Sequence, residues 1–174
     1  LAATRSTCLA FPVGAVIVKN KQVVATGYNG SPSGSAHCTS QGYCYTNLSS
    51  CDASKSLPSR AIHAEANAIA QAAKYGISTE GAKIYVTLEP CLSCLKLIIS
   101  AGIDEVYYET HSSGRDSAAI RDSFVKEGLV KLQQVQLSDM TAQIAAASLL
   151  KPTSVVQAKP VDSPYLRRDG VINN

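Results

Sequence analysis

Four residues have the types and the spacing of a metal-dependent hydrolytic site. His63 stands two residues before Glu65, and Cys91 and Cys94 form a Cys-x-x-Cys pair later in the chain. One His and two Cys can hold a single zinc ion and leave its fourth tetrahedral position for water, as in a catalytic zinc site. Glu65 is badly placed to ligate the same ion but well placed to move protons beside it. The pattern therefore predicts zinc ligands at His63, Cys91 and Cys94 and a proton shuttle at Glu65.

His-x-Glu followed by Pro-Cys-x-x-Cys is the signature of the zinc nucleobase deaminases, and the chain, with Pro90 before the first Cys, resembles that superfamily. Bound zinc lowers the pKa of its water to roughly 7 and so gives a zinc-bound hydroxide at neutral pH. Glu65 would pass the proton of that water to the ring nitrogen and then to the departing ammonia. The alternatives are a closed structural zinc ribbon and a core His beside an accidental Cys-x-x-Cys, and the His-x-Glu element favours catalysis.

Both halves of this site are expected at the start of a helix. The spacing of Ala and Ile predicts a buried helix over residues 61–74, and a second helix is predicted over 90–101, where Pro90 suits the first turn. Cys91 and Cys94 are three residues apart and share one helical face, and a helix N-terminus favours thiolate over thiol.

The rest of the sequence predicts the strands and helices that position these two helices. Residues 20–22 form a predicted hairpin turn, and further helices are predicted over 118–127 and 141–150. The element order predicts a three-layer α/β/α fold, with a mixed five-stranded sheet and helices on both faces. The same cytidine-deaminase-like fold is implied by the resemblance. The predicted strands are 13–19, 23–28, 83–88, 105–109 and 129–137, of which the first two are antiparallel and the later ones parallel.

Size and composition predict one domain. The chain has 174 residues, of which 45% are hydrophobic and 17% charged. A single zinc-dependent deaminase domain is expected over 1–150, with a C-terminal extension or tail over 151–174. Residues 30–58 are rich in Gly, Ser and Cys, and a loop of that length in a compact domain is usually functional or held by something.

The charge and the apolar runs limit the partners. The formal net charge is +3, without the basic stripe of a polynucleotide binder, so a small anionic ligand and no nucleic acid are expected. No apolar run approaches the ~20 residues of a membrane span, and the start lacks a signal peptide pattern. The expected location is the cytoplasm, or the host cytoplasm if the protein is phage-encoded, with no membrane partner.

Further motifs narrow the resemblance to the deoxycytidylate (dCMP) deaminases. Residues 27–34 read Gly-Tyr-Asn-Gly-Ser-Pro-Ser-Gly and are similar to the GYNGxPxG element of that family. The resemblance covers about residues 5–137. It also rests on residues 5–8, 13–15, 63–69 and 96–103.

The resemblance implies a homohexamer that deaminates dCMP to dUMP and ammonia and feeds thymidylate synthesis. By position in the family, Asn29 would contact the substrate sugar, the Ala64 N–H the pyrimidine carbonyl, and His111 the substrate. Arg115 or Arg5 would hold the phosphate, because a guanidinium suits a phosphate. A turn residue is the local alternative for Asn29, and a surface-loop histidine is the alternative for His111.

The resemblance also implies activation by dCTP with Mg²⁺ and inhibition by dTTP. The GYNG element helps form the triphosphate site in this family, and two glycines let a backbone approach phosphates closely. A simple Gly-rich turn is the alternative. The implied effector residues are Gly27, Tyr28, Asn29, Gly30 and Lys74.

Four cysteines remain. Some relatives carry a second, structural zinc held by a Cys before the first strand and by residues of the loop after GYNG, and Cys8 and Cys38 match those positions. Cys44 and Cys51 would complete a closed tetrahedral site. Free buried thiols and a disulfide are the alternatives, and a reducing compartment disfavours the disulfide.

Two other functions compete. A tRNA adenosine deaminase shares the zinc signature, but the GYNG element, residues 5–8 and the lack of a basic stripe argue against it. A non-catalytic zinc-binding or nucleotide-binding module is the other alternative. Glu65 argues against that module, because the carboxylate is not needed to hold the metal.

Overall fold

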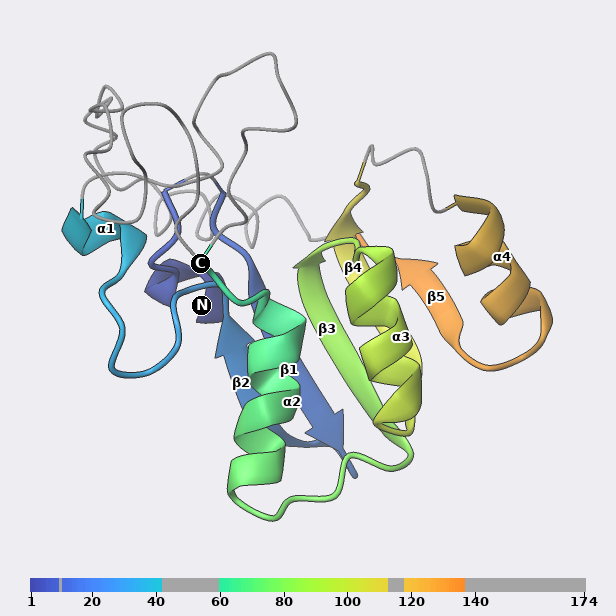
Figure 1. The fold of residues 1–174 in the computed structure, drawn as a ribbon. Helices are drawn as coiled ribbons and strands as arrows, with labels where there is room; N and C mark the ends of the chain where they lie inside the picture. Colours follow the sequence, from blue (N-terminus) through green and yellow to red (C-terminus); the bar gives the residue numbers. More distant parts are fainter. Residues whose placement is uncertain (10, 42–59, 113–117, 137–174) are drawn as a thin grey trace, which may run out of the picture.

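The computed structural model describes residues 1–9, 11–41, 60–112 and 118–136. These residues form one five-stranded sheet with the strand order β2-β1-β3-β4-β5 (Figure 1). The strands are β1 (Gly14–Lys19), β2 (Gln22–Tyr28), β3 (Ala82–Leu88), β4 (Ile103–Thr110) and β5 (Lys131–Gln134). The helices are the 3-10 turn η1 (Ala2–Arg5), α1 (Cys38–Gln41), α2 (Ala64–Lys74), α3 (Leu92–Ser100) and α4 (Ala118–Lys126).

A tight hairpin joins β1 and β2, which are antiparallel, with Gly14 paired to Tyr28. Asn20 and Lys21 both have positive φ, 52° and 63°. Two consecutive residues with positive φ make the two-residue turn whose twist matches that of the flanking strands. The turn predicted at residues 20–22 is therefore confirmed and is centred on Asn20 and Lys21.

Helical crossovers connect the other strands. β1 is antiparallel to β2 and to β3, whereas β3, β4 and β5 are parallel, so β2 also runs parallel to β3. Crossovers between parallel strands are right-handed in nearly all proteins, which brings α2, α3 and α4 to one face of the sheet. In agreement, α3 contacts both α2 and α4 (Figure 1). The starts of α2 and α3 therefore meet at the carboxyl ends of the strands, where α/β proteins bind ligands.

The core lies between the sheet and the helices α2 and α3. Ala64, Ala68 and Ala72 recur every four residues, so they form one face of α2, and all three are buried. Their small side chains let α2 lie close to the strands. The largest buried side chains belong to the strands and to α3, and they are Ile17, Ile84, Leu95, Ile98, Ile103 and Val106.

The opposite face of β3 and β4 is aromatic and charged. Tyr85 and Tyr107 stack with ring centroids 4.9 Å apart. Lys83 Nζ lies 3.0 Å from Glu105 Oε2, and the Tyr107 hydroxyl donates to the same carboxylate. These residues alternate along their strands with core residues, as expected for the two faces of a sheet.

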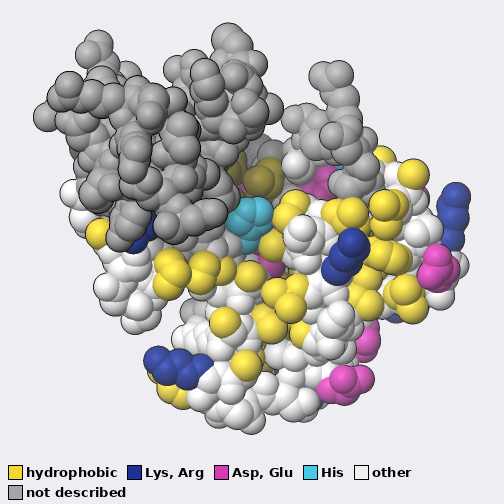
Figure 2. All heavy atoms as spheres, viewed as in Figure 1, with side chains coloured by type: hydrophobic (Ala, Val, Ile, Leu, Met, Phe, Trp, Pro, Cys, Tyr) yellow, Lys and Arg dark blue, Asp and Glu magenta, His cyan; other side chains and the backbone are white. Residues whose placement is uncertain are grey.

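Several large apolar side chains are exposed on the helical side of the molecule. Leu97 of α3, Ile120 and Val125 of α4, and Leu129 after α4 are between 39% and 46% exposed. Figure 2 shows apolar side chains gathered on this side. Surface patches of this kind often mark interaction sites.

The predicted mixed five-stranded sheet of a cytidine-deaminase-like α/β fold is confirmed, with corrections at element ends. In the described part α2, α3 and α4 lie on one face of the sheet, so helices on both faces stay a prediction. The helix predicted from residue 61 begins at Ala64, because His63 is its extended N-cap. Pro90 precedes α3 rather than opening it, because Cys91 is the N-cap. The last strand is shorter than predicted, because only Lys131–Gln134 pairs with β4.

Two short elements are absent from the prediction, and some predictions concern residues that the structure does not describe. The short elements η1 and α1 were not predicted, since four residues are too few to show a helical period. The helix predicted over 141–150, the tail over 151–174 and the domain boundary at 150 lie outside the described residues. Each helix of the described part falls short of the length and hydrophobicity that crossing a membrane requires.

Candidate active site

Three side chains from two helix starts converge on one point. The Nδ1 atom of His63 lies 3.5 Å from Cys91 Sγ and 3.4 Å from Cys94 Sγ. All three ligand atoms lie within 4.8 Å of one another. In a tetrahedral site with Zn–S near 2.3 Å and Zn–N near 2.0–2.1 Å, nitrogen and sulfur ligands stand about 3.5 Å apart. The donor set and its spacing therefore fit zinc, and the exposure of His63 and Cys91 leaves the site open on one side.

The local backbone explains this convergence. His63 and Cys91 are the N-caps of α2 and α3, and both are extended, with ψ of 153° and 163°. Each stands at the positive end of a helix dipole, close to N–H groups that have no intrahelical partner. Cys94 follows in the first turn of α3 and shares a face with Cys91. The fold thus favours anionic ligands at this point.

The two thiols have opposite pKa shifts. Hydrogen bonds from Cys94 and from His63 lower the pKa of Cys91 to about 3. The hydrogen bond with Cys91, together with burial and the nearby Glu65 carboxylate, raises the pKa of Cys94. The hydrogen bond with Cys91 also raises the pKa of His63. These contacts favour the anionic form of Cys91, the form that binds a metal ion.

Glu65 lies beside these ligands in the first turn of α2 and is only 4% exposed. Burial raises the pKa of Glu65, which moves the carboxyl toward the range where it can both accept and return a proton near neutral pH. Glu65 lines a cavity of about 280 Å³ together with His63, Ala64 and Cys91. Its other lining residues are Cys8, Phe11, Val13, Asn29, Leu88, Glu89 and Ser112.

Asn29 lines this cavity, but most of the hydrogen-bonding capacity of its side-chain amide is already used by other residues of the protein. Its Oδ1 accepts hydrogen bonds from Ser6 Oγ at 2.6 Å and from the Val13 N–H at 2.8 Å. Its Nδ2 donates to the Phe11 carbonyl at 2.7 Å. Asn29 therefore ties the N-terminal segment to the end of β2, and its second Nδ2 hydrogen is the group that a ligand can use.

Ala64 also lines the cavity. It is the first residue of α2, and the N–H groups of a first helical turn lack intrahelical partners. A backbone donor at the wall of the cavity can bind a carbonyl oxygen of a ligand without any side chain.

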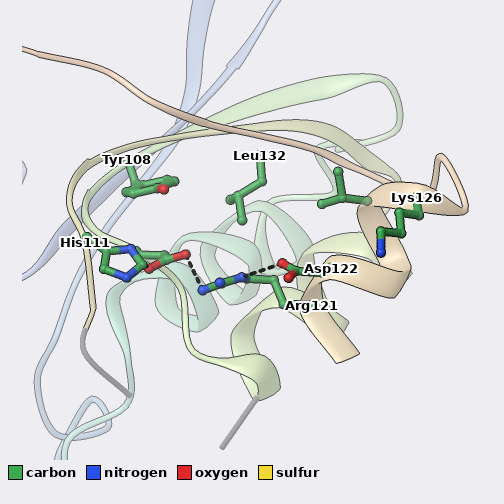
Figure 3. Close-up of a pocket in the computed structure, with 8 residues that line it drawn as sticks. Tyr108, His111, Arg121, Asp122, Lys126 and Leu132 are labelled. Atoms are coloured by element: carbon green, nitrogen blue, oxygen red, sulfur yellow. Dashed lines mark hydrogen bonds and ion pairs between the residues drawn. The ribbon is translucent and has the colours of Figure 1, made fainter. Parts of the chain in front are cut away.

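His111 stands at a second cavity, of about 350 Å³, beside α4 (Figure 3). Its Nδ1 lies 2.6 Å from Glu89 Oε2, and Arg121 binds the other oxygen of the same carboxylate. Figure 3 shows His111 and Arg121 along one wall, opposite Tyr108 and Leu132. Among the described residues Glu89 lines both cavities, whereas His111 lines the second, so the substrate contact predicted for His111 stays a prediction.

Of the two predicted phosphate residues, Arg5 and Arg115, the structure describes Arg5. Arg5 lies exposed in η1 and is not among the described residues that line the cavity. Arg115 lies outside the described residues. Lys74, predicted to tune the effector response, ends α2 and is exposed, with its Nζ 5.8 Å from the Tyr75 ring centroid.

The GYNG residues pack β2 against its neighbours. A Cβ on Gly27 would overlap the backbone of α2. The Tyr28 carbonyl accepts a hydrogen bond from Asn67 Nδ2 at 2.8 Å. Gly30 exchanges two backbone hydrogen bonds with Ile62, which brings the two ends of the long loop together. These contacts hold the end of β2 against the start of α2.

Two of the remaining cysteines lie in adjacent segments. Cys8 lines the first cavity, and Cys38 is buried at the start of α1. The Thr7 carbonyl accepts a hydrogen bond from the Thr39 N–H at 3.3 Å, and Thr7 Oγ1 lies 3.1 Å from His37 Nδ1. The segments that carry Cys8 and Cys38 are therefore neighbours.

The other two cysteines, Cys44 and Cys51, lie outside the described residues. Within the part of the chain that the structure describes, His63, Cys91 and Cys94 form the one group of three close metal-binding side chains. The second zinc stays a prediction.

Sequence reasoning missed Glu89, Phe11 and Ser112 as residues of this site. A signal for Glu89 does exist, because an acidic residue stands between an apolar strand and Pro-Cys-x-x-Cys. Phe11 and Ser112 carry no such signal, because only the folded path of their segments brings them to the cavity.

Comparison with known sequences agrees with the site. The family model for the cytidine and deoxycytidylate deaminase zinc-binding region matches residues 1–110. The chain is 43% identical over 144 residues to ComE operon protein 2 of Bacillus subtilis (strain 168). The alignment covers 83% of this chain and 70% of that protein. The chain is 42% identical over 117 residues to the deoxycytidylate deaminase of Mycobacterium phage D29, covering 64% of this chain and 88% of that protein.

A solved enzyme has the same fold. The dCMP deaminase from cyanophage S-TIM5 in apo form aligns with a TM-score of 0.58 and 31% identity, over 78% of this chain and 89% of that chain. Its complex with dCMP and dUMP aligns with a TM-score of 0.56 and 29% identity, over 72% and 82% of the two chains.

Proposed function

The chain belongs to the cytidine and deoxycytidylate deaminase family of zinc-dependent deaminases, and we propose that it catalyses the hydrolytic deamination of dCMP to dUMP and ammonia. The observation that carries this proposal is that buried Glu65 lines the same cavity as the His63 and Cys91 ligands. The substrate is suggested by the related D29 enzyme and by the dCMP and dUMP bound to the cyanophage enzyme.

Glu65 has the central chemical role in the proposed reaction. Zinc held by His63, Cys91 and Cys94 would supply the Lewis acidity that lowers the pKa of water to about 7. Glu65 accepts a proton from the attacking water as its oxygen bonds to C4 of cytosine, and delivers the proton to N3. Glu65 then carries the proton of the new C4 hydroxyl to the amino group. The C4–N bond breaks, ammonia leaves, and the water oxygen becomes the C4 carbonyl of dUMP.

Other residues hold the nucleotide in this proposal. The Ala64 N–H donates to the pyrimidine carbonyl, and the remaining Nδ2 hydrogen of Asn29 donates to a sugar hydroxyl. Both residues line the cavity that Glu65 lines, which supports their assignment. His111 contacts the nucleotide from the end of β4, and Arg115 or Arg5 binds the phosphate.

Regulation by triphosphates is part of the proposal. dCTP with Mg²⁺ activates the enzyme and dTTP inhibits it, through Gly27, Tyr28, Asn29, Gly30 and Lys74. Support comes from the direct packing of Gly27 on α2, the helix that carries Glu65 and ends at Lys74. A ligand that moves the end of β2 would therefore move the catalytic helix.

The proposed assembly is a cytoplasmic homohexamer that binds small nucleotides and no nucleic acid, and that feeds thymidylate synthesis. The exposed apolar side chains of α3 and α4 support self-association. A second, structural zinc is proposed at Cys8 and Cys38, with Cys44 and Cys51 as the remaining ligands. Thr7, next to Cys8, supports this site because it makes hydrogen bonds to His37 and Thr39, the two residues that flank Cys38.

The test is chromatographic detection of dUMP formed from dCMP by the zinc-loaded protein. Reactions without effector, with dCTP and Mg²⁺, and with dTTP and Mg²⁺ would run beside controls on cytidine and deoxycytidine. We expect turnover of dCMP that rises with dCTP and falls with dTTP. Turnover that ignores both triphosphates would remove the regulation, and no turnover of any cytosine substrate would contradict the proposed reaction.

A further inference from the structure

Glu89 holds three structural elements together around one buried carboxylate. The residue follows the last residue of β3, and its side chain is 2% exposed. Its Oε1 accepts from Arg121 Nη1 of α4 at 2.5 Å. Its Oε2 lies 2.6 Å from His111 Nδ1 and accepts from the Ser112 N–H at 3.1 Å. The ends of β3 and β4 and the helix α4 therefore meet at this side chain.

Stability alone does not account for this arrangement. Burying a carboxylate is unfavourable unless it is paired and hydrogen-bonded, and a buried ion pair replaced by apolar groups of similar size often leaves stability unchanged or raises it. A carboxylate with three directed partners does, however, fix the positions of those partners relative to one another. The Glu89 N–H also donates to the Thr110 carbonyl at 2.8 Å, which extends the link between β3 and β4.

Glu89 lies where the positions of its partners affect the candidate active site. Glu89 stands two residues before the ligand Cys91, and it lines the cavity that contains Glu65. Ser112, whose N–H donates to the Glu89 carboxylate, lines the same cavity. Arg121 and His111 hold the carboxylate from the second cavity (Figure 3).

We propose that Glu89 is a positioning residue, which sets the wall of the substrate cavity at Ser112 relative to the turn that carries Cys91. The inference rests on the proposed deamination for its effect on catalysis, but its structural part does not. Glu89 acts through Ser112 and takes no part in the proton transfers. Its removal should therefore weaken substrate binding more than it slows the chemical step.

The experiment compares three variants of the zinc-loaded full chain. Glu89→Gln keeps an acceptor for the Ser112 N–H. The double variant Glu89→Met with Arg121→Met removes the buried carboxylate together with its cationic partner, so that no buried charge is left unpaired. Asp122→Asn is the matched control, because Asp122 contacts Arg121 Nε at 3.5 Å from the exposed side and does not touch Glu89 in the described contacts. The measurements are zinc content, KM and kcat for dCMP, and hydrogen–deuterium exchange of peptides that contain Ser112.

For the double variant we expect normal zinc content, a KM raised by about 10- to 100-fold with a smaller change in kcat, and faster exchange at Ser112. Glu89→Gln should fall between the double variant and the wild type, and Asp122→Asn should match the wild type. If the double variant does not fold, Glu89→Gln decides on the same measurements.

Several results would overturn the assignment. An unchanged KM with unchanged exchange at Ser112 would leave Glu89 as a structural ion pair. Faster exchange without a change in KM would show that the position of Ser112 does not affect substrate binding. Loss of zinc with a fall in kcat alone would mean that Glu89 supports Cys91 instead. If the wild type does not deaminate dCMP, the proposed function fails, and the exchange at Ser112 alone decides whether Glu89 positions this wall.

Discussion

Gly27 of β2 and Ala64 of α2 pack backbone against backbone. A Cβ on Gly27 would overlap the Ala64 carbonyl oxygen and would lie 2.5 Å from the Ala68 nitrogen. The strand thus lies directly against the start of α2, the helix whose N-cap is His63. The position of the catalytic helix depends on the absence of a side chain at residue 27.

Gly27→Ala should therefore destabilise the protein and reduce activity. Overpacking of a core typically costs 1–3 kcal/mol, and we expect about 3 kcal/mol or more here because backbone atoms cannot rotate away. For a chain of this size that corresponds to a fall in Tm of roughly 6–12 °C by calorimetry. The control is Gly34→Ala, where a Cβ meets nothing within 4 Å and only the left-handed backbone, φ +85°, is unfavourable. Equal Tm values for wild type and Gly27→Ala would contradict the close packing.

Asn29→Asp tests the amide network at the end of β2. The carboxylate still accepts from Ser6 and Val13, but it cannot donate to the Phe11 carbonyl and would place a charge beside that oxygen. We expect about 1–3 kcal/mol lower stability in denaturant unfolding, and lower activity because Phe11 and Val13 line the cavity. Ser6→Ala removes the bonds of Ser6 Oγ to Asn29 and to the Cys8 N–H but places no charge beside the Phe11 carbonyl, so it should cost less. A fully active and stable Asn29→Asp would show that the amide is dispensable.

The zinc ligands could be predicted from sequence because their signal is local. His63 and Glu65 stand in one turn, Cys91 and Cys94 in another, and each turn begins a helix whose apolar spacing is visible in the chain. The antiparallel first pair and the parallel later strands could also be predicted from the order of the elements. The order of the strands in the sheet was not predicted, because β3 pairs with β1 and not with its chain neighbour β2.

The polar contacts around the site could not be predicted in the same way. Glu89 and Arg121 are 32 residues apart, and nothing in either segment specifies the other as its partner. His111 Nδ1 likewise meets Glu89 Oε2, a contact that the sequence pattern does not show, and the substrate contact predicted for His111 stays a prediction. Pairings of this kind depend on the exact register and packing of distant elements, which composition and periodicity do not determine.

Glu65→Gln should separate chemistry from folding. The amide has nearly the same shape but cannot carry the proton, so we expect kcat for dCMP to fall by about 10²- to 10⁴-fold. Zinc content and Tm should stay near the wild-type values, because Glu65 lies beside the metal ligands without being one of them. Glu127→Gln, an exposed change after α4, should leave activity unchanged. Turnover of Glu65→Gln at the wild-type rate would rule out the proposed proton shuttle.

Zinc removal should abolish activity reversibly. Treatment with a chelator should stop dCMP turnover, and added Zn²⁺ should restore it, because the His63, Cys91 and Cys94 donors fit one zinc ion. Cys91→Ser should lose this zinc permanently, as measured by elemental analysis. If the proposed second site at Cys8 and Cys38 exists, the wild type should hold two zinc ions per chain and Cys91→Ser one. A single zinc in the wild type and none in Cys91→Ser would exclude the second site.

Glu105 should make a small, pH-dependent contribution to stability. The Tyr107 hydroxyl and the Lys83 ammonium hold the pKa of Glu105 below its ordinary value of 4.5. A carboxylate with a lowered pKa in the folded state stabilises the protein above its unfolded pKa and loses that contribution as pH falls through the folded value. Glu105→Gln should therefore lower Tm slightly at pH 7, and the difference should shrink as the pH falls below 4.5. Thermal unfolding of both proteins across this range tests the sign, and a difference that grows toward acid pH would contradict it.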